Sequence, residues 1–104
     1  IDESYEITAE FESNGAAAGL YLFYNEKAFT GTQLNDSHFY IRILNDKNVV
    51  SVWSSTDGEK WNQVIKNQDV SSYHHNTYQG FFALRPSIMV NDGVTVKDFK
   101  YVTK

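Results

Sequence analysis

The chain has 104 residues, of which 41% are hydrophobic and 15% aromatic, and its formal net charge is -4 at pH 7. This length suits a single domain with one core, and the negative charge argues against a nucleic-acid partner, which requires a basic patch. The sequence has no cysteine, so disulfides and thiolate metal sites are excluded. No apolar run approaches the roughly 18 residues of a membrane-spanning helix, so no membrane partner is expected.

The first half of the chain is predicted to form four strands, because apolar and polar residues alternate along it. Residues 4–12 and 38–44 each place apolar side chains at every second position. Residues 19–24 are apolar on both faces, which indicates a central strand, and a shorter strand is expected at residues 29–34. The residues expected to face the core from the two alternating segments are Tyr5, Ile7, Ala9, Phe11, Phe39, Ile41 and Ile43.

The second half of the chain is predicted to continue as strands. Residues 49–55 and 61–65 are rich in β-branched and aromatic types, and Asp57-Gly58 between them favours a tight hairpin turn. Residues 66–77 are polar and are predicted to be irregular. A strand is predicted at 78–85, ended by Pro86, and a last strand at 94–102.

The predicted elements together indicate an all-β fold. No segment of 12 residues has helical periodicity, and a turn signal recurs about every 8–12 residues. This pattern is typical of an antiparallel β-sandwich. Because the strand pattern begins almost at Ile1, we expect residues 1–104 to be a single β-sandwich domain excised from a larger multidomain protein.

Four stretches of the chain match, in order, the motifs of one known domain. They are residues 18–27 (AGLYLFYNEK), 43–58 (ILNDKNVVSVWSSTDG), 73–86 (YHHNTYQGFFALRP) and 99–101 (FKY). With them the chain resembles the C-terminal β-sandwich domain of family 43 glycoside hydrolases. It departs from that pattern at Ser54, where a tyrosine is usual, and in a shorter link between Gln33 and Phe39.

The resemblance implies a fold and a function. The fold is a concanavalin A-like jelly roll, non-catalytic and joined to a five-bladed β-propeller in the same chain that cleaves xylosyl or arabinosyl linkages. The implied function is an accessory domain that binds xylan or arabinoxylan, with xylo- or arabino-oligosaccharide as its partner, in a bacterial enzyme located outside the cell or in the periplasm. One alternative is a purely structural module that packs on the propeller and has no glycan affinity. An independent hydrolase ranks last.

Aromatic residues are the main candidates for carbohydrate binding, because the C–H faces of sugar rings stack on tryptophan and tyrosine. The predicted binding residues are Tyr24, Tyr40, Trp53, Tyr78 and Arg85. We expect Tyr21 and Phe23 to share one concave sheet face with Tyr40, Trp53 and Tyr78, with Arg42 and Arg85 nearby. The alternative is that such rings fill the core, and this alternative is favoured for Phe23, Phe81, Phe82 and Phe99.

Metal binding and catalysis have weaker support. His74 and His75 are adjacent, so in an extended segment their side chains point to opposite faces and do not readily bind one ion. A structural calcium ion is the only cofactor considered, with Glu12 and Asp98 as candidate ligands; charged residues on an edge strand are the favoured alternative. The carboxylates fall on predicted solvated faces and turns, so no opposed pair for glycosidase chemistry is predicted and the chain is expected not to be an enzyme.

Overall fold

The protein is an antiparallel β-sandwich. The structure is a computed structural model that describes residues 4–25, 28–69 and 85–104. Its strands are β1 (Ser4–Ser13), β2 (Ala18–Asn25), β3 (Ala28–Leu34), β4 (His38–Asp46), β5 (Val49–Ser55), β6 (Asn62–Asp69), β7 (Arg85–Val90) and β8 (Val94–Thr103). No helix that could cross a membrane occurs among these residues.

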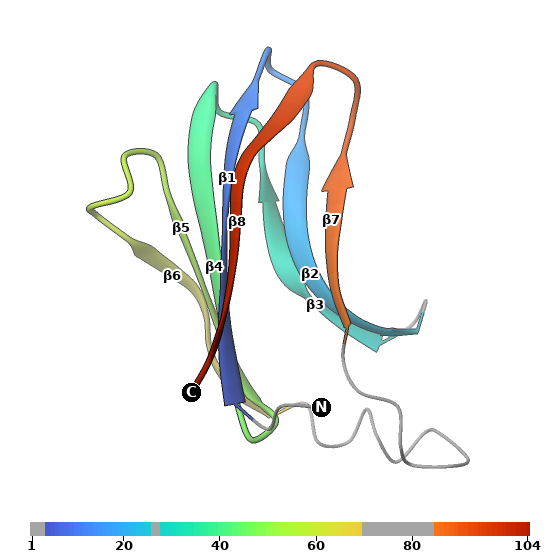
Figure 1. Cartoon of the computed structure of the whole chain (residues 1–104), viewed down its shortest axis with the longest axis vertical. Coiled ribbons are helices and arrows are strands. Elements are labelled where there is room, and N and C mark those ends of the chain that lie inside the picture. Colours follow the sequence, from blue (N-terminus) through green and yellow to red (C-terminus); the bar gives the residue numbers. More distant parts are fainter. Residues whose placement is uncertain (1–3, 26–27, 70–84) are drawn as a thin grey trace.

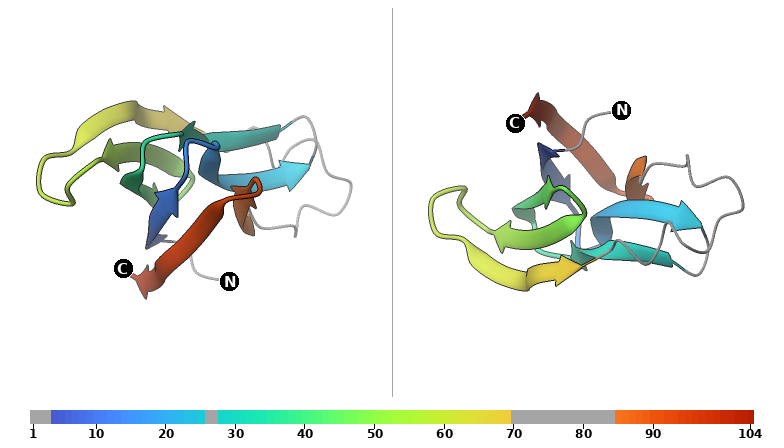
Figure 2. Two further views of the ribbon diagram at one scale, coloured as in Figure 1. Left: turned by 90° about the horizontal axis from the view of Figure 1, so that it is seen from above. Right: turned by 90° about the horizontal axis from the view of Figure 1, so that it is seen from below.

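The strands form two sheets that face one another (Figure 1). The larger sheet has five strands in the order β6-β5-β4-β1-β8, and the smaller has three in the order β3-β2-β7. All neighbouring strands are antiparallel. In both end-on views the three-stranded sheet covers one face of the larger sheet, and the connection between β5 and β6 extends away from it (Figure 2). The predicted antiparallel β-sandwich is therefore confirmed.

The core lies between the sheets and is built by the predicted alternation. All seven residues expected to face the core from β1 and β4 are buried, and Leu20 and Leu22 of β2 meet them from the smaller sheet. Phe11 and Phe39 are both fully buried and stack with ring centroids 4.9 Å apart. The predicted central position of β2 is also confirmed, because it pairs with β3 on one side and β7 on the other.

Two strand boundaries differ from the prediction. The polar segment Lys66–Asp69, expected to be irregular, belongs to β6. Polar contacts stabilise this part of the strand: the Asn67 backbone N–H donates to Ser51 Oγ at 3.0 Å, and Thr30 Oγ1 of the opposite sheet donates to Gln68 Oε1 at 2.6 Å. The polar composition of this segment indicated a loop. The partners that hold it as a strand lie 16 and 38 residues away along the chain, so local composition does not reveal them.

Pro86 is the second difference. It lies inside β7, opposite Leu22 of β2, rather than ending a strand. β7 is the last strand of the smaller sheet, and an edge strand tolerates proline because the side facing away from the sheet needs no N–H donor. The rest of the strand predicted at 78–85, and the pair His74 and His75, lie outside the described residues.

One side of the sandwich leaves apolar side chains exposed. β7 and β8 are the edge strands of their sheets on this side, and the pairing registers direct Ile88, Val90, Val96, Phe99 and Tyr101 to the core side of the two sheets. These five residues are nevertheless 36–50% exposed. The expectation that Phe99 is a core residue is therefore wrong: its exposed fraction is 41%, and it lies on β8, the edge strand of the larger sheet.

Candidate functional site

The outer face of the five-stranded sheet groups two of the predicted binding residues. β4 lies between β5 and β1, and its register sets Arg42 opposite Trp53 of β5 on one side and Thr8 of β1 on the other. Two residues along, Tyr40 lies opposite Glu10 of β1. All five side chains point away from the core, because they alternate with the buried residues of the same strands, and all are half-buried.

Trp61 completes this group from the connection between β5 and β6. The Arg42 guanidinium carbon lies 4.1 Å from the centroid of the Trp61 ring, which is a cation–π contact. The Tyr40 and Trp61 rings also contact one another edge-on, with centroids 6.2 Å apart and ring planes at 62°. We call Tyr40, Arg42, Trp53 and Trp61 the outer-face cluster. It offers two tryptophan rings, a phenol and a guanidinium within one part of the sheet surface.

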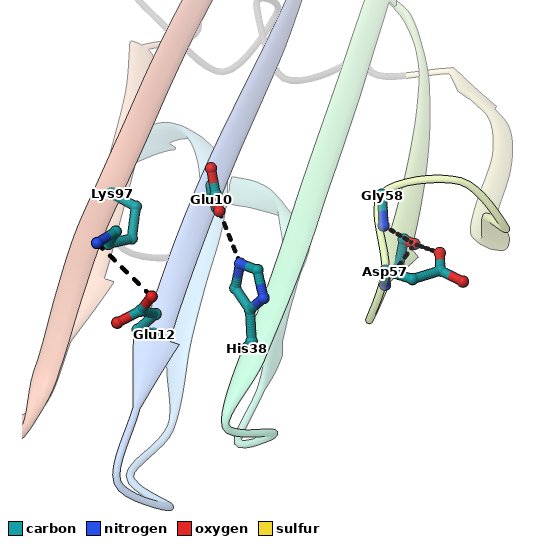
Figure 3. A network of polar contacts seen from close by, with 7 residues as sticks. Glu10, Glu12, His38, Asp57, Gly58 and Lys97 are labelled. Atoms are coloured by element: carbon teal, nitrogen blue, oxygen red, sulfur yellow. Dashed lines mark hydrogen bonds and ion pairs between the residues drawn. The ribbon is translucent and has the colours of Figure 1, made fainter.

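The turn before Trp61 is fixed by two side chains. Ser55 Oγ accepts the amide N–H of Gly58 at 2.8 Å (Figure 3). The Asp57 carboxylate accepts the amide N–H groups of Glu59 and Lys60 at 2.8 and 2.9 Å. These bonds, with the Lys60 amide first, lower the pKa of Asp57. Gly58 has φ +80°, a conformation that favours glycine. The predicted Asp57-Gly58 turn is therefore present, and six residues separate β5 from β6 where the predicted strands left five.

Gly58 also lies directly against the outer-face cluster. A Cβ atom at this position would be 3.2 Å from two carbon atoms of the Tyr40 ring. The absence of a side chain at Gly58 thus allows the turn to pack on Tyr40, while the same turn carries Trp61 back to Arg42. The Asp57-Gly58 turn therefore positions the outer-face cluster in addition to connecting β5 and β6.

A histidine–carboxylate pair borders the cluster. His38 Nε2 and Glu10 Oε2 are 2.6 Å apart, joining β4 to β1 (Figure 3). This hydrogen bond is the main reason that the pKa of Glu10 lies below its usual value. Partial burial, followed by the charge of Glu10, raises the pKa of Tyr40. His38 thus serves as a hydrogen-bonding side chain between β4 and β1.

The other predicted binding residues are distributed differently. Tyr24 lies in β2 and Arg85 in β7, so both belong to the three-stranded sheet, and Tyr78 lies outside the described residues. The predicted binding residues included neither Trp61 nor Arg42. Trp61 was placed in a strand by its β-rich neighbours; the long, side-chain-bonded turn that returns it to Arg42 depends on contacts that a turn motif alone does not specify.

The expected common face for the aromatic residues is wrong in one respect. Tyr21 and Phe23 belong to β2 and lie on the outer face of the smaller sheet, so they point away from Tyr40 and Trp53. There they form an aromatic group with Phe29: Phe23 and Phe29 stack at 5.1 Å, and Tyr21 contacts both rings edge-on. Phe23 is half-buried on this face rather than in the core that was favoured for it.

The two candidate calcium ligands are close to lysines. Glu12 lies 3.6 Å from Lys97, and Asp98 lies 3.9 Å from Lys100 while also accepting the Phe99 amide N–H at 2.9 Å. The register of β1 and β8 shifts next to Asp98, which indicates a bulge at this point. Calcium takes six to eight oxygen ligands, and no group of three potential ligand residues exists in the described part of the chain. Calcium binding stays a prediction.

Comparison with known proteins identifies the fold. No protein-family model and no curated protein matches this sequence. The structure is similar to the GH43 BlXynB protein from Bacillus licheniformis, with a TM-score of 0.73 at 13% identity, over 98% of this chain and 28% of that one. It is also similar to a functionally unknown protein from Saccharomyces cerevisiae, with a TM-score of 0.68 at 11% identity, over 100% of this chain and 71% of that one.

These similarities show that the chain has a β-sandwich fold found within a family 43 glycoside hydrolase. The chain spans less than a third of the length of that enzyme. The yeast protein has the same fold in a chain of which this one covers most. The class defined by the fold and the surface is thus an all-β sandwich with an aromatic, arginine-containing group on the outer face of its larger sheet.

Proposed function

We propose that the chain is a non-catalytic accessory domain of a bacterial, hemicellulose-degrading glycoside hydrolase and that it binds xylan- or arabinoxylan-type carbohydrate. Two independent lines support the class of protein. The sequence motifs resemble the C-terminal β-sandwich of family 43 enzymes, and the fold occurs within one such enzyme. The catalytic β-propeller is then a partner in the same chain, located outside the cell or in the periplasm.

The observation that carries carbohydrate binding is the outer-face cluster. Tryptophan and tyrosine rings stack on the C–H faces of sugars, and the guanidinium of Arg42 donates hydrogen bonds to oxygen atoms. The cluster lies on a regular sheet, with Arg42 held between Trp61 and Thr8, so little order has to be gained on binding. An exposed sheet face of this kind suits an extended oligosaccharide with weak affinity.

The arrangement of carboxylates supports a non-catalytic role. Glycoside hydrolysis uses two carboxyl groups about 5–10 Å apart on either side of a sugar. On this sheet face the carboxylates of Glu6, Glu10, Glu12 and Asp98 each lie within 4 Å of a lysine or histidine. They belong to a solvated surface of paired charges, and hydrolysis is assigned to the propeller.

Titration calorimetry with xylo- and arabinoxylan oligosaccharides tests the proposal. We expect weak binding by the chain and loss of that binding in Trp53→Ala. The matched control is Tyr21→Ala, which removes a half-buried aromatic residue from the outer face of the other sheet and should leave affinity unchanged. Both variants should retain most of their thermal stability. Equal loss of affinity in the two variants, or no heat from the unmodified chain with any fragment, would refute this function.

A structural module remains the second candidate because of the exposed apolar residues on β7 and β8. Five core-side side chains that are 36–50% exposed at one side of the sandwich suit contact with another domain. On this proposal Phe99→Lys should weaken association with the separately produced propeller in ultracentrifugation. The same variant should not alter carbohydrate binding, because Phe99 lies on the core side of β8 and the outer-face cluster does not contain it.

A further inference from the structure

Arg42 differs from the three lysines of β8 and its end. Lys97, Lys100 and Lys104 lie 3.6–3.9 Å from the carboxylates of Glu12, Asp98 and Glu6. Arg42 has no carboxylate within that range in the part of the chain that the structure describes. It is also the more buried cation, since it lies on a central strand whereas the lysines lie on β8 and at its end. A half-buried cation without an internal counter-ion has unused capacity for an anion.

The surroundings of Arg42 hold its guanidinium in place. The Trp61 ring covers one face of the guanidinium at 4.1 Å, and Nε donates to Thr8 Oγ1 at 3.5 Å, a long and weak bond. A guanidinium has five N–H donors in one plane, and stacking on a ring leaves the donors at its edge available. The planar fork matches the two oxygens of a carboxylate, which it binds with paired hydrogen bonds.

Two carboxylates in this region, those of Glu10 and Asp57, are already engaged. Glu10 lies two residues beyond Thr8 on β1, and its carboxylate is bound to His38 at 2.6 Å. Asp57, in the turn that precedes Trp61, accepts the amide N–H groups of Glu59 and Lys60. His38, half-buried beside Tyr40 with ring centroids 5.1 Å apart, adds a hydrogen-bonding group whose Nε2 is directed to Glu10. Arg42 is thus the one group of the cluster suited to an external anion.

We propose that the outer-face cluster is specific for hemicellulose chains that carry a carboxylate, namely xylo-oligosaccharides substituted with a uronic acid. Arg42 binds the carboxylate of the substituent, while Trp53 and Trp61 contact the sugar rings. This inference rests on the proposed function, because it assigns a ligand class to the same site. It adds that a charged substituent, rather than the neutral backbone alone, determines which glycan binds.

The experiment compares three ligands by titration calorimetry at low ionic strength. These are a linear xylo-oligosaccharide, the same oligosaccharide with one uronic acid substituent, and the free uronic acid. We expect the substituted oligosaccharide to bind about tenfold tighter than the neutral one, as a hydrogen-bonded charge pair allows. The free acid should bind more weakly than the substituted oligosaccharide, because it lacks the ring contacts. Added salt should reduce the preference.

Two Arg42 variants and one lysine variant locate the effect. Arg42→Met, which keeps an unbranched side chain over Trp61, should abolish the preference, so that the neutral and the substituted oligosaccharide bind with equal affinity. Arg42→Lys should keep only part of the preference, since a lysine cannot form the paired contact. Lys100→Met is the control: it removes an exposed cation from the same row of the sheet, beside Thr8, and should leave the preference intact.

The outcomes separate this inference from the function on which it rests. Equal affinity for neutral and substituted oligosaccharides overturns the carboxylate specificity while carbohydrate binding stands. A preference that survives in Arg42→Met, or that falls equally in Lys100→Met, assigns the effect to general surface charge and also overturns it. Tighter binding of the free acid than of the substituted oligosaccharide would assign the site to small anions. No binding of any ligand refutes the proposed function itself.

Discussion

Replacing Gly58 by alanine tests whether the β5–β6 turn positions the outer-face cluster. Gly58 has φ +80°, and a residue with a Cβ atom in the left-handed region costs about 1–2 kcal/mol. In a domain of about 100 residues, each kcal/mol lowers the melting temperature by roughly 4–8 °C. The new methyl group would also lie 3.2 Å from the Tyr40 ring, so that the ring must shift by a few tenths of an ångström. We therefore expect lower stability together with weaker carbohydrate binding.

Gly15→Ala is the matched control for this prediction. Gly15 also has a positive φ, +111°, but a Cβ atom there would have no neighbour within 4 Å. It lies in the turn between β1 and β2, outside the outer-face cluster. Gly15→Ala should thus lower the melting temperature through the backbone alone and leave both the affinity and the near-ultraviolet circular dichroism of the aromatic residues unchanged.

Thermal melts, near-ultraviolet circular dichroism and calorimetry on the three proteins decide the matter. If Gly58→Ala has the same melting temperature as the unmodified chain, the strain assigned to this turn is wrong. If Gly58→Ala is destabilised but its aromatic spectrum and affinity match those of Gly15→Ala, the turn does not position Tyr40 and the coupling between turn and site is refuted.

Three further predictions follow from the core, the charges and the function. Phe39→Ala should lower the free energy of unfolding by about 3–5 kcal/mol in urea melts, because Phe39 is fully buried. Val64→Ala, at a 48% exposed position, should change it by less than about 0.5 kcal/mol. Similar losses in the two variants would contradict the assigned core. The lowered pKa of Glu10 and Asp57 means that both stabilise the fold above the unfolded-state carboxyl pKa and that this stability is lost as pH falls through their folded-state values. Urea melts from pH 7 to pH 2 should show that loss, and Asp57→Asn should reduce its slope; an unchanged slope counts against the assigned hydrogen bonds. The isolated chain should not hydrolyse aryl xylosides or arabinofuranosides, and turnover that disappears on replacing one carboxylate would contradict the non-catalytic role.

Much of the fold could be predicted because strand alternation is a local property. In β1 and β4 every second side chain points to the same face, so the apolar positions alone identified residues that are buried in the structure. The same reasoning identified β2 as central, since Leu20 and Leu22 on one face and Tyr21 and Phe23 on the other all required contacts. The turn at Asp57-Gly58 was also local information, because the positive φ of Gly58 is a requirement of a single residue.

The candidate site was only half predicted, for a physical reason. Tyr40 and Trp53 are outward-facing aromatic residues on adjacent strands, which periodicity and the order of the chain can indicate. Assigning Tyr21 to the same face failed because periodicity gives the face of a strand and not the sheet to which that strand belongs.

The sequence by itself determined β1, β2 and β4, the inward faces of β1 and β4 and the turn chemistry, because each depends on residues within a few positions of one another, whereas it missed the end of β6 and most of β7. The tertiary structure alone decided which strands share a sheet, because the pairing of β1 with β8 joins residues about 90 positions apart. It placed Pro86 on an edge and left Phe99 partly exposed, since both depend on where each sheet ends. It also set the Trp61 ring over Arg42, a contact between a turn and a neighbouring strand that no local pattern encodes.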